Sequence, residues 1–449
     1  MKIIIIGGVA AGAKAAAKSK RLLPEADVHI YTQDTHVSYS ECGLPYYIAG
    51  DFADWEKLIV RTVDEFERSG INVHTEHRVT KILPADKKIL VKNLNLNTCN
   101  FVEYDRLIIA TGAVPKIPEI KNFKLKNVYT LRTLEDGINI KESMEKSQRI
   151  TIVGGGYIGV ELIESFVKNE KQVTLVERSP FILSVFDEDI SSLIQTFVLE
   201  NSNGLVKIIN EDDVTEFVGE ECVTGILTAK GCGFETDMVV IASGVSPVVD
   251  IAKDAGIELG ITGAIKVNSR MQTNIRDIYA CGDCVEKVNM ISNSPMWLPL
   301  GSTANKEGRI AAINACGGSE DFEGILGSAV LRYHALNISM TGLTEKSAQK
   351  IGYDTVSVVI TKRDKAGYMP EVQNVTLKLI ADRRSHRVLG AQAIGCGDAD
   401  KRVNTVSVGL LGGMKVEDLL DVDLTYAPPF STSIDILISA ARILKSKLS

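Results

Sequence analysis

Two stretches of the chain follow the same plan, and this repeat constrains the fold more than any other feature. One is KIIIIGGVAAGAKAAAKSKRLLPEADVHIYTQD, from Lys2, and the other is RITIVGGGYIGVELIESFVKNEKQVTLVER, from Arg149. Each has an apolar strand, a glycine turn, a helix and a second apolar strand, which is the order of a βαβ nucleotide-binding unit. We therefore predict two such modules in an α/β fold. Because the plan recurs inside the chain, we expect its first copy to be a buried strand and not a signal peptide.

The composition narrows the class of protein. A chain of 449 residues has a prior of roughly three domains of about 150 residues each. The net charge of -7 gives no support for binding nucleic acid or an anionic membrane, and no long apolar run predicts a membrane span. The eight cysteines are scattered without the spacing of a disulfide framework, so we expect a cytoplasmic protein. The six histidines lack metal-ligand spacing, and no metal is predicted.

The internal glycine turn carries the stronger nucleotide motif. Gly154, Gly156 and Gly159 have the GxGxxG spacing, which permits a tight turn, close approach of a pyrophosphate and close packing of the helix on the strand. Glu177 ends the second strand at the offset where a carboxylate binds both ribose hydroxyls. The sequence therefore predicts a preference for NADH, while Arg178 leaves the use of NADPH open.

The N-terminal turn is the weaker of the two. Its middle fingerprint position, between Gly7 and Gly12, is Val9 and not glycine. The carboxylate expected after the second strand is also missing, because Thr32 and Gln33 stand there. We leave two alternatives open for the ribose: Asp34 binds it, or neutral groups do.

A third motif connects these turns to a known family. The spacing T-x4-I-Y-A-x-G-D ends at Gly282-Asp283, and Ala110-Thr111-Gly112 follows an earlier strand. With these motifs the sequence resembles the pyridine nucleotide-disulfide oxidoreductase superfamily over essentially the whole chain. The resemblance implies FAD on the first module, NAD(P)H on the second and a C-terminal dimerisation domain.

The expected fold is thus two Rossmann-like nucleotide-binding domains plus an α+β C-terminal domain. We place the FAD-binding domain at residues 1–113 and 243–323, the NAD(P)H-binding domain at 114–242 and the dimerisation domain at 324–449. After about Gly324 the pattern changes to strands that look antiparallel, DTVSVVITKR, NVTLKLIAD and VLGAQAIG, followed by a helix, NTVSVGLLGGM.

Cys42, in VSYSECGLPYYIAG, indicates the branch of the superfamily. The glutathione-reductase-like branch has a second cysteine in C-x4-C spacing, and here that position is Tyr47. The stretch resembles the single-cysteine branch of coenzyme A-disulfide reductases, NADH peroxidases, NADH oxidases and persulfide reductases. Peroxidases and oxidases usually have a histidine in the first glycine turn, and GGVAAG has none. We therefore favour a disulfide or persulfide substrate.

Other residues match the coenzyme A-disulfide reductases in particular. Tyr368 and Tyr426 match the tyrosines that those enzymes present from the dimer partner to the substrate sulfur, and Asn305 and Arg309 match the same group's pattern. The structural alternatives are packing of Tyr426 beside two prolines and a loop-surface position for Tyr368.

Glu41 departs from that pattern, because the reductases often have a neutral residue such as asparagine before the cysteine. A carboxylate beside the thiol disfavours the thiolate and repels an anionic substrate, which puts CoA disulfide itself in doubt. Lys18, Lys20 and Arg21 offer compensating charge, although a solvated helix face is the simpler role for most of them. Cys281 and Cys284 have C-x-x-C spacing, and we interpret them as thiols that flank the Gly-Asp motif and not as a redox pair.

The resemblance implies the following roles. The catalytic residues are Cys42, Tyr368 and Tyr426. The residues expected to bind FAD are Gly7, Gly8, Val9, Ala11, Gly12, Asp34, Ser38, Thr111, Gly112, Gly282, Asp283, Gly301, Thr303 and Ala304, and those expected to bind NAD(P)H are Gly154, Gly156, Tyr157, Ile158, Gly159, Glu161, Glu177 and Gly244. The residues expected to bind the substrate are Arg21, Ser38, Glu41, Asn305 and Arg309. Tyr157 resembles the family's gate over the flavin, and Glu161 faces the same side one turn later.

The expected activity is FAD-dependent reduction of a small, CoA-disulfide-like molecule by a homodimer, through a mixed disulfide with Cys42. Three alternatives remain. One is an NADH oxidase in which the cysteine cycles through sulfenic acid. Another is a persulfide or polysulfide reductase, which a fused rhodanese domain would favour, although we expect no room for one here. The third, from a different class, is an electron-transfer flavoprotein that passes electrons to a partner protein.

Overall fold

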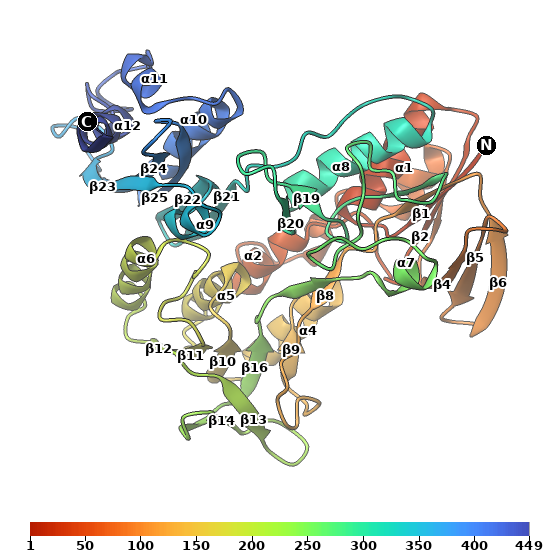
Figure 1. Ribbon diagram of the computed structural model, residues 1–449. Coiled ribbons are helices and arrows are strands. Elements are labelled where there is room, and N and C mark those ends of the chain that lie inside the picture. Colours follow the sequence, from red (N-terminus) through yellow and green to blue (C-terminus); the bar gives the residue numbers. More distant parts are fainter. Residues whose placement is uncertain (449) are drawn as a thin grey trace.

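The computed structural model describes residues 1–448. Its first module is built on a parallel five-stranded sheet in the order β18-β7-β1-β2-β3, in which β1 (Lys2–Ile6) is central. The sheet also contains β2 (Asp27–Tyr31), β3 (Ile71–His74), β7 (Arg106–Ile109) and β18 (Ile278–Ala280). Helices α1 (Ala10–Leu22) and α8 (Gly301–Ala315) pack against each other beside this sheet (Figure 1). The isoleucines of β1 are buried on both faces, as expected for a parallel strand between helices.

The second module repeats this architecture. Its five-stranded sheet has the order β12-β11-β10-β16-β9 and consists of β9 (Val128–Thr130), β10 (Arg149–Val153), β11 (Gln172–Glu177), β12 (Val206–Asn210) and β16 (Met238–Ile241). Its helices are α4 (Leu134–Glu145), α5 (Tyr157–Lys168) and α6 (Glu188–Glu200). A smaller antiparallel sheet follows, with β13 (Val214–Val218), β14 (Gly225–Thr228) and β15 (Gly233–Glu235). Both predicted βαβ units are therefore present.

Two short strands join the modules. The chain leaves the first module through β8 (Ala113–Pro115) and returns through β17 (Val245–Pro247), and these strands pair antiparallel. A helix of one and a half turns, α2 (Leu44–Ala49), lies between the modules and contacts both α4 and α5. The other short elements of the first module are α3 (Val63–Arg68), α7 (Asp250–Asp254), β19 (Lys287–Val288) and β20 (Pro295–Met296).

The third part is an antiparallel sheet flanked by helices, as the sequence predicted. Its strands, in the order β21-β22-β25-β24-β23, are β21 (Ala329–Tyr333), β22 (Leu336–Gly342), β23 (Thr355–Arg363), β24 (Asn374–Asp382) and β25 (Val388–Gly395). The helices are α9 (Glu345–Lys350), α10 (Ala399–Leu411), α11 (Val416–Asp421) and α12 (Ile436–Leu448). The helix predicted over NTVSVGLLGGM begins earlier, at Ala399, and ends before the glycine pair.

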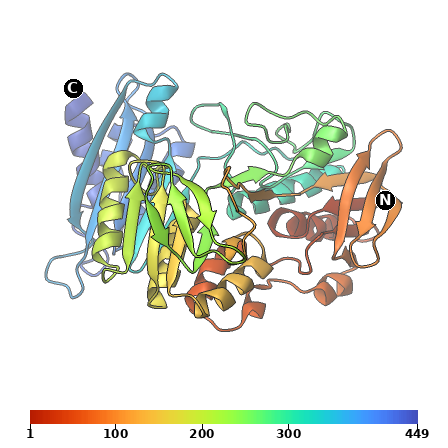
Figure 2. The ribbon, with the colours of Figure 1, turned by 90° about the horizontal axis from the view of Figure 1, so that it is seen from below.

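One element was missed from the sequence. Strands β4 (His77–Leu83), β5 (Lys88–Asn93) and β6 (Thr98–Glu103) form a separate antiparallel sheet that projects from the first module (Figure 1; Figure 2). Its outer strand β6 is mostly exposed, so it lacks the continuous apolar run that made the other strands recognisable. Among residues 1–448, no helix is long and apolar enough to cross a membrane.

A buried polar cluster connects the third part to the second module. Lys378 on β24 is 4% exposed, and its ammonium nitrogen lies 2.8 Å from Asp189, 2.9 Å from Glu345 and 3.3 Å from Asp187. Gln392 on β25 donates a hydrogen bond of 2.6 Å to the Asp187 carboxylate. These contacts position the antiparallel sheet against the loop before α6.

Candidate active site

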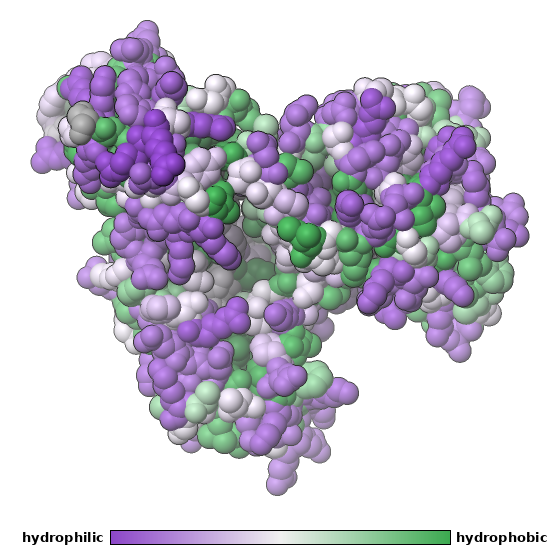
Figure 3. All heavy atoms as spheres, viewed as in Figure 1, coloured by the Kyte–Doolittle hydropathy of each residue, from purple (hydrophilic) through white to green (hydrophobic). Residues whose placement is uncertain are grey.

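A cavity of about 1760 Å³ opens where the three parts meet. The space-filling view shows the surface hollowed between the lobes (Figure 3). Both glycine turns, Cys42 and the Gly282-Asp283 pair line this cavity. The structure therefore brings together motifs that are far apart in the chain, since Gly7 and Gly282 are separated by 275 positions.

The first glycine turn leaves no space for side chains at its tight positions. Gly7 has φ +103°, and a Cβ there would lie 2.1 Å from the Ala110 carbonyl oxygen. A Cβ at Gly12 would lie 2.0 Å from the Gly7 carbonyl oxygen, which explains how closely α1 approaches β1. Val9 has a negative φ of −94° and immediately precedes α1, so a side chain is tolerated there. The N-terminus of α1 faces the cavity and suits a phosphate group.

The second glycine turn is matched to Glu177. The two Glu177 carboxylate oxygens accept hydrogen bonds from the backbone N–H groups of Gly155, at 2.7 Å, and Ser179, at 2.8 Å. The carboxylate is thereby fixed at the end of β11, beside the N-terminus of α5. Arg178 is exposed at the same end of the cavity. Opposite charges therefore stand next to each other where the sequence predicts the adenosine ribose.

Asp34 is the carboxylate available at the corresponding end of the first module. Thr32, at the usual acidic position, is buried, and its hydroxyl accepts the backbone N–H of Asp34 at 3.3 Å. Asp34 lines the cavity, and burial raises the pKa of its carboxyl. Of the two alternatives left open by the sequence, this placement supports Asp34.

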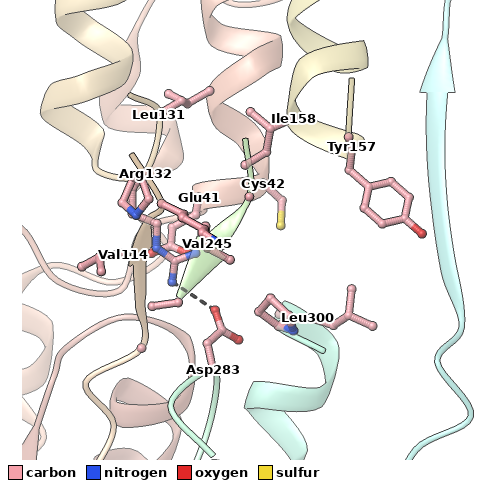
Figure 4. Close-up of a pocket in the computed structure, with 18 of the residues that line it drawn as sticks. Glu41, Cys42, Val114, Leu131, Arg132, Tyr157, Ile158, Val245, Asp283 and Leu300 are labelled. Carbon is pink, nitrogen blue, oxygen red and sulfur yellow. Dashed lines mark hydrogen bonds and ion pairs between the residues drawn. The ribbon is translucent and has the colours of Figure 1, made fainter. Parts of the chain in front are cut away.

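Cys42 lies in a 3₁₀ turn, Glu41–Gly43, directly before the start of α2. Its sulfur points into the pocket between Ile158 and Leu300 (Figure 4). A Cβ at Gly301, the first residue of α8, would be 4.0 Å from this sulfur. Burial, together with the charges of Glu161 and Glu41, raises the pKa of the Cys42 thiol.

Arg132 is a site residue that the sequence did not reveal. It precedes α4, and its guanidinium lies 3.2 Å from the Glu41 carboxylate and 3.0 Å from the Asp283 carboxylate (Figure 4). Burial raises the pKa of Glu41 to about 7 although Arg132 opposes this shift. No motif marks Arg132, because its position depends on how the loop after β9 folds back onto the first module.

Tyr157 and Glu161 stand on the cavity side of α5, as their spacing predicts. The Tyr157 hydroxyl lies 3.6 Å from the Met340 sulfur on β22, and burial raises the pKa of Tyr157 to about 12. Burial also raises the pKa of Glu161 to about 7. Helix α5 contacts α2 through the Ser165 hydroxyl, which shares its proton between the Pro45 carbonyl oxygen at 2.8 Å and the Glu161 carbonyl oxygen of its own helix at 2.9 Å.

A second cavity, which we call the α1 groove, has a volume of about 790 Å³ and adjoins the first. It follows α1 from Val9 to Pro24, and Glu41 and Cys42 line both cavities. Four basic side chains line the groove: Lys14, Lys20, Arg21 and Arg61. Ser38 and Asn305 also line it.

Most predicted site residues therefore converge. The following line the main cavity: Gly7, Gly8, Val9, Ala11, Gly12, Asp34, Glu41, Cys42, Thr111, Gly112, Gly154, Gly156, Tyr157, Ile158, Glu161, Glu177, Gly244, Gly282, Asp283, Gly301 and Ala304. Ser38, Arg21 and Asn305 line the groove. Thr303 and Gly159 are buried behind the wall, in α8 and α5.

Besides Thr303 and Gly159, three predicted residues line neither cavity of the single chain. Arg309 pairs with Glu320 at 2.5 Å. Tyr368 and Tyr426 are 77% and 52% exposed on the third part.

Cys281 and Cys284 are fully buried as free thiols, and burial raises the pKa of each, which suits packing and not redox chemistry.

Comparison with known proteins identifies the family. The model of the pyridine nucleotide-disulphide oxidoreductase family matches residues 1–308, and the model of its dimerisation domain matches residues 328–437. The chain belongs to the pyridine nucleotide-disulphide oxidoreductase family. The resemblance stated from the sequence is thus confirmed, as are the two Rossmann-type domains and the C-terminal domain.

Individual relatives span nearly the whole chain. An NAD(P)H coenzyme A polysulfide/persulfide reductase from Pyrococcus horikoshii is 35% identical over 448 residues, which are 99% of this chain and 98% of that protein. A coenzyme A disulfide reductase from Staphylococcus haemolyticus is 29% identical and covers 97% of both chains. The crystal structure of reduced Bacillus anthracis CoADR-RHD superimposes with a TM-score of 0.96 at 33% identity and covers 100% of this chain and 80% of that one.

The family uses FAD and NAD(P)H, and the residues present fit both cofactors. Asp283 Oδ1 is buried and has no hydrogen-bond partner among the described residues, whereas its other oxygen holds Arg132. A free, buried carboxylate oxygen beside the first glycine turn suits a ribityl hydroxyl of FAD. Glu177, fixed by two backbone N–H groups, suits the ribose of NADH.

Proposed function

We propose that the enzyme uses NAD(P)H to reduce a small disulfide of the CoA-disulfide type, with Cys42 as its only redox-active cysteine. The observation that carries this proposal is the place of Cys42 at the junction of the nucleotide cavity and the basic α1 groove. Tyr47, which replaces the second cysteine of two-cysteine enzymes, is 6% exposed and stacks under Lys141. All eight cysteines are free thiols and Tyr47 occupies the position of the second cysteine, so the substrate would supply the second sulfur.

Each of the three domains would bind a different cofactor or partner. Residues 1–113 and 243–323 would hold FAD, residues 114–242 NAD(P)H, and residues 324–449 the partner subunit of a homodimer. Asp283, Asp34 and the first glycine turn would bind FAD, which supplies two electrons taken from the nicotinamide. The eight free cysteines suit a reducing, cytoplasmic location.

Cys42 performs the sulfur chemistry. Its thiolate attacks one sulfur of a disulfide RS–SR, the S–S bond of the substrate breaks, and RS⁻ departs and takes up a proton. The product is a mixed disulfide between Cys42 and RS. Two electrons from the nucleotide side would break its S–S bond, which releases the second RS⁻ and restores the Cys42 thiolate. Position next to the N-terminal ends of α2 and α8 favours the Cys42 thiolate, which offsets part of the opposing effect of burial.

The α1 groove is the proposed site for the body of the substrate. Lys14, Lys20, Arg21 and Arg61 give it the positive charge that phosphate groups of a CoA-type molecule need. Ser38 and Asn305 line the same groove as these cations and Cys42. Tyr368 and Tyr426 would complete the site from the partner subunit, because their exposure leaves them available at the surface of the third part.

A Cys42→Ser variant tests the proposal. It should bind FAD and be reduced by NADH at the normal rate, while turnover of a CoA-type disulfide falls by about 100-fold or more. Stopped-flow flavin reduction and steady-state NADH consumption measure the two steps separately. Cys99→Ser, at an exposed cysteine on β6, is the matched control and should behave as wild type. Undiminished disulfide turnover in Cys42→Ser would refute the mechanism.

An NADH oxidase is the second candidate, because a relative from Methanocaldococcus jannaschii with that name is 31% identical over 100% of both chains. Oxygen uptake distinguishes the two functions. An oxidase consumes oxygen in proportion to NADH without any added disulfide, whereas the proposed reductase consumes NADH under anaerobic conditions when the disulfide is present.

A further inference from the structure

Glu41 stands beside the reacting sulfur in a position that the proposed mechanism does not use. It directly precedes Cys42 in the 3₁₀ turn, and the two residues line both the main cavity and the α1 groove. A substrate sulfur that reaches Cys42 through the groove therefore comes within the field of Glu41, whose negative charge also acts on the Cys42 thiol. The side chain is 25% exposed, so water screens its charge only in part.

The charges that face Glu41 are mainly negative. Arg132 is the cation within 4 Å of its carboxylate in the described chain, and Arg132 also pairs with Asp283. The other titratable groups that face Glu41 or Cys42 are Asp34, Tyr39, Tyr46, Glu161 and Asp283, all of which are neutral or anionic. One guanidinium thus serves two carboxylates, and the surroundings of the sulfur carry an excess of negative charge when Glu41 is ionised.

The α1 groove also carries positive charge. Lys20 and Arg21 lie in the last turn of α1, and Lys14 and Arg61 line the same groove. None of these four cations is within 4 Å of Glu41 in the described chain. The groove therefore combines cations along α1 with a carboxylate at the sulfur, which complements a molecule with an anionic body and an uncharged reacting group.

We propose that Glu41 selects substrates by the charge on the reacting sulfur, favouring uncharged disulfides RS–SR over anionic persulfides RSS⁻ and polysulfides. This inference rests on the proposed function and specifies its substrate class. An anionic sulfur has to approach Glu41 and the Cys42 thiolate together, whereas a disulfide brings no charge to that point. The RS⁻ that leaves a disulfide carries its charge away from the carboxylate and gains a proton from water.

Two alkylating reagents test Glu41 without relying on turnover. Iodoacetamide is uncharged and iodoacetate is anionic, and both transfer a carbon to the thiolate with loss of iodide. We expect the ratio of their rates at Cys42, measured at pH 8 by peptide mass spectrometry of the holoenzyme, to fall about tenfold in Glu41→Gln. Alkylation of the exposed Cys99 in the same samples corrects for the intrinsic reactivity of each reagent. Glu56→Gln removes an exposed carboxylate outside both cavities and should match wild type.

The pH dependence gives a further readout. Since the pKa of Glu41 is raised to about 7, lowering the pH from 8 to 6 adds a proton and removes its charge. The iodoacetamide-to-iodoacetate ratio of wild type should therefore fall toward the value of Glu41→Gln, while the ratio of the variant stays constant. Glu41→Asn provides a second neutral side chain if Glu41→Gln does not fold.

Reoxidation of the flavin by two different substrates completes the test. NADH-reduced enzyme is mixed anaerobically with CoA disulfide or with inorganic polysulfide, and flavin reoxidation is followed at pH 8. In Glu41→Gln, the rate of flavin reoxidation by polysulfide should rise about tenfold relative to the rate with the disulfide. Reagent and substrate ratios that do not change in the neutral variants would overturn the proposal. If neither oxidant reoxidises the wild-type flavin, the proposed function fails, and the alkylation ratio alone decides the role of Glu41.

Discussion

At the residue scale, Arg178 offers a direct test of cofactor choice. It is exposed beside Glu177, whose carboxylate is fixed by two backbone hydrogen bonds. A guanidinium attracts the 2′-phosphate of NADPH and has little effect on the unphosphorylated ribose of NADH. We expect Arg178→Ala to raise KM for NADPH about tenfold and to leave KM for NADH within about twofold, measured in steady-state assays. An equal rise for both nucleotides would assign Arg178 a structural role instead.

The residues of the candidate site differ in how well the sequence predicts them. Gly7 and Gly154 are predictable because a positive φ in a tight turn leaves a local pattern. Cys42 is predictable because it is a lone thiol in a distinctive segment. Arg132 is not, since its contacts with Glu41 and Asp283 arise only when a loop of the second module meets the first. Long-range ion pairs leave no spacing to recognise.

At the element scale, the Lys378 cluster fixes the antiparallel sheet to the second module. Lys378→Met would leave Asp187, Asp189 and Glu345 close together without their shared cation. We expect the free energy of unfolding to fall by roughly 3 kcal/mol, because removing one partner of a buried ion pair leaves uncompensated charge. The measurement is the urea midpoint of the FAD-loaded enzyme.

The control for this change is Lys350→Met, at an exposed lysine in the last turn of α9. It removes the same charge from the same sheet assembly and should shift the midpoint little. A similar midpoint for both variants would show that the cluster contributes no more than a surface charge.

The elements themselves were largely predictable where apolar periodicity was strong. Both βαβ units and the three long strands β23, β24 and β25 lie where their patterns placed them. The projecting sheet β4–β6 was missed because its outer strand is solvated and has no buried face. The start of α10 was misplaced because Ala399 to Arg402 contains three charged residues, which hide the helical pattern.

At the scale of the whole molecule, the proposed site requires two subunits. If Cys42 and Tyr426 meet across the dimer, a subunit with Cys42→Ser and a subunit with Tyr426→Phe contain one intact site between them. Refolded or co-expressed mixtures should therefore recover about a quarter of wild-type disulfide turnover, since half of the dimers are mixed and each has one intact site of two.

The two homodimeric variants assayed separately provide the baseline for this complementation. Recovery above their average supports a site shared across the dimer. Activity equal to the average would place Tyr426 outside the site or within the same subunit as its thiol, and a fully active monomer would exclude a shared site altogether.

The hydrogen bond from Ser165 to the Pro45 carbonyl has a mechanical consequence. It connects α2, which follows Cys42, to α5, which follows the second glycine turn. Hinge bending between the two modules would have to break this hydrogen bond. The electron donor and electron acceptor ends are thus linked by a contact whose loss would cost about 1 kcal/mol. A swing of the domains for product exchange would have to give up this contact together with the packing of α2 on α5.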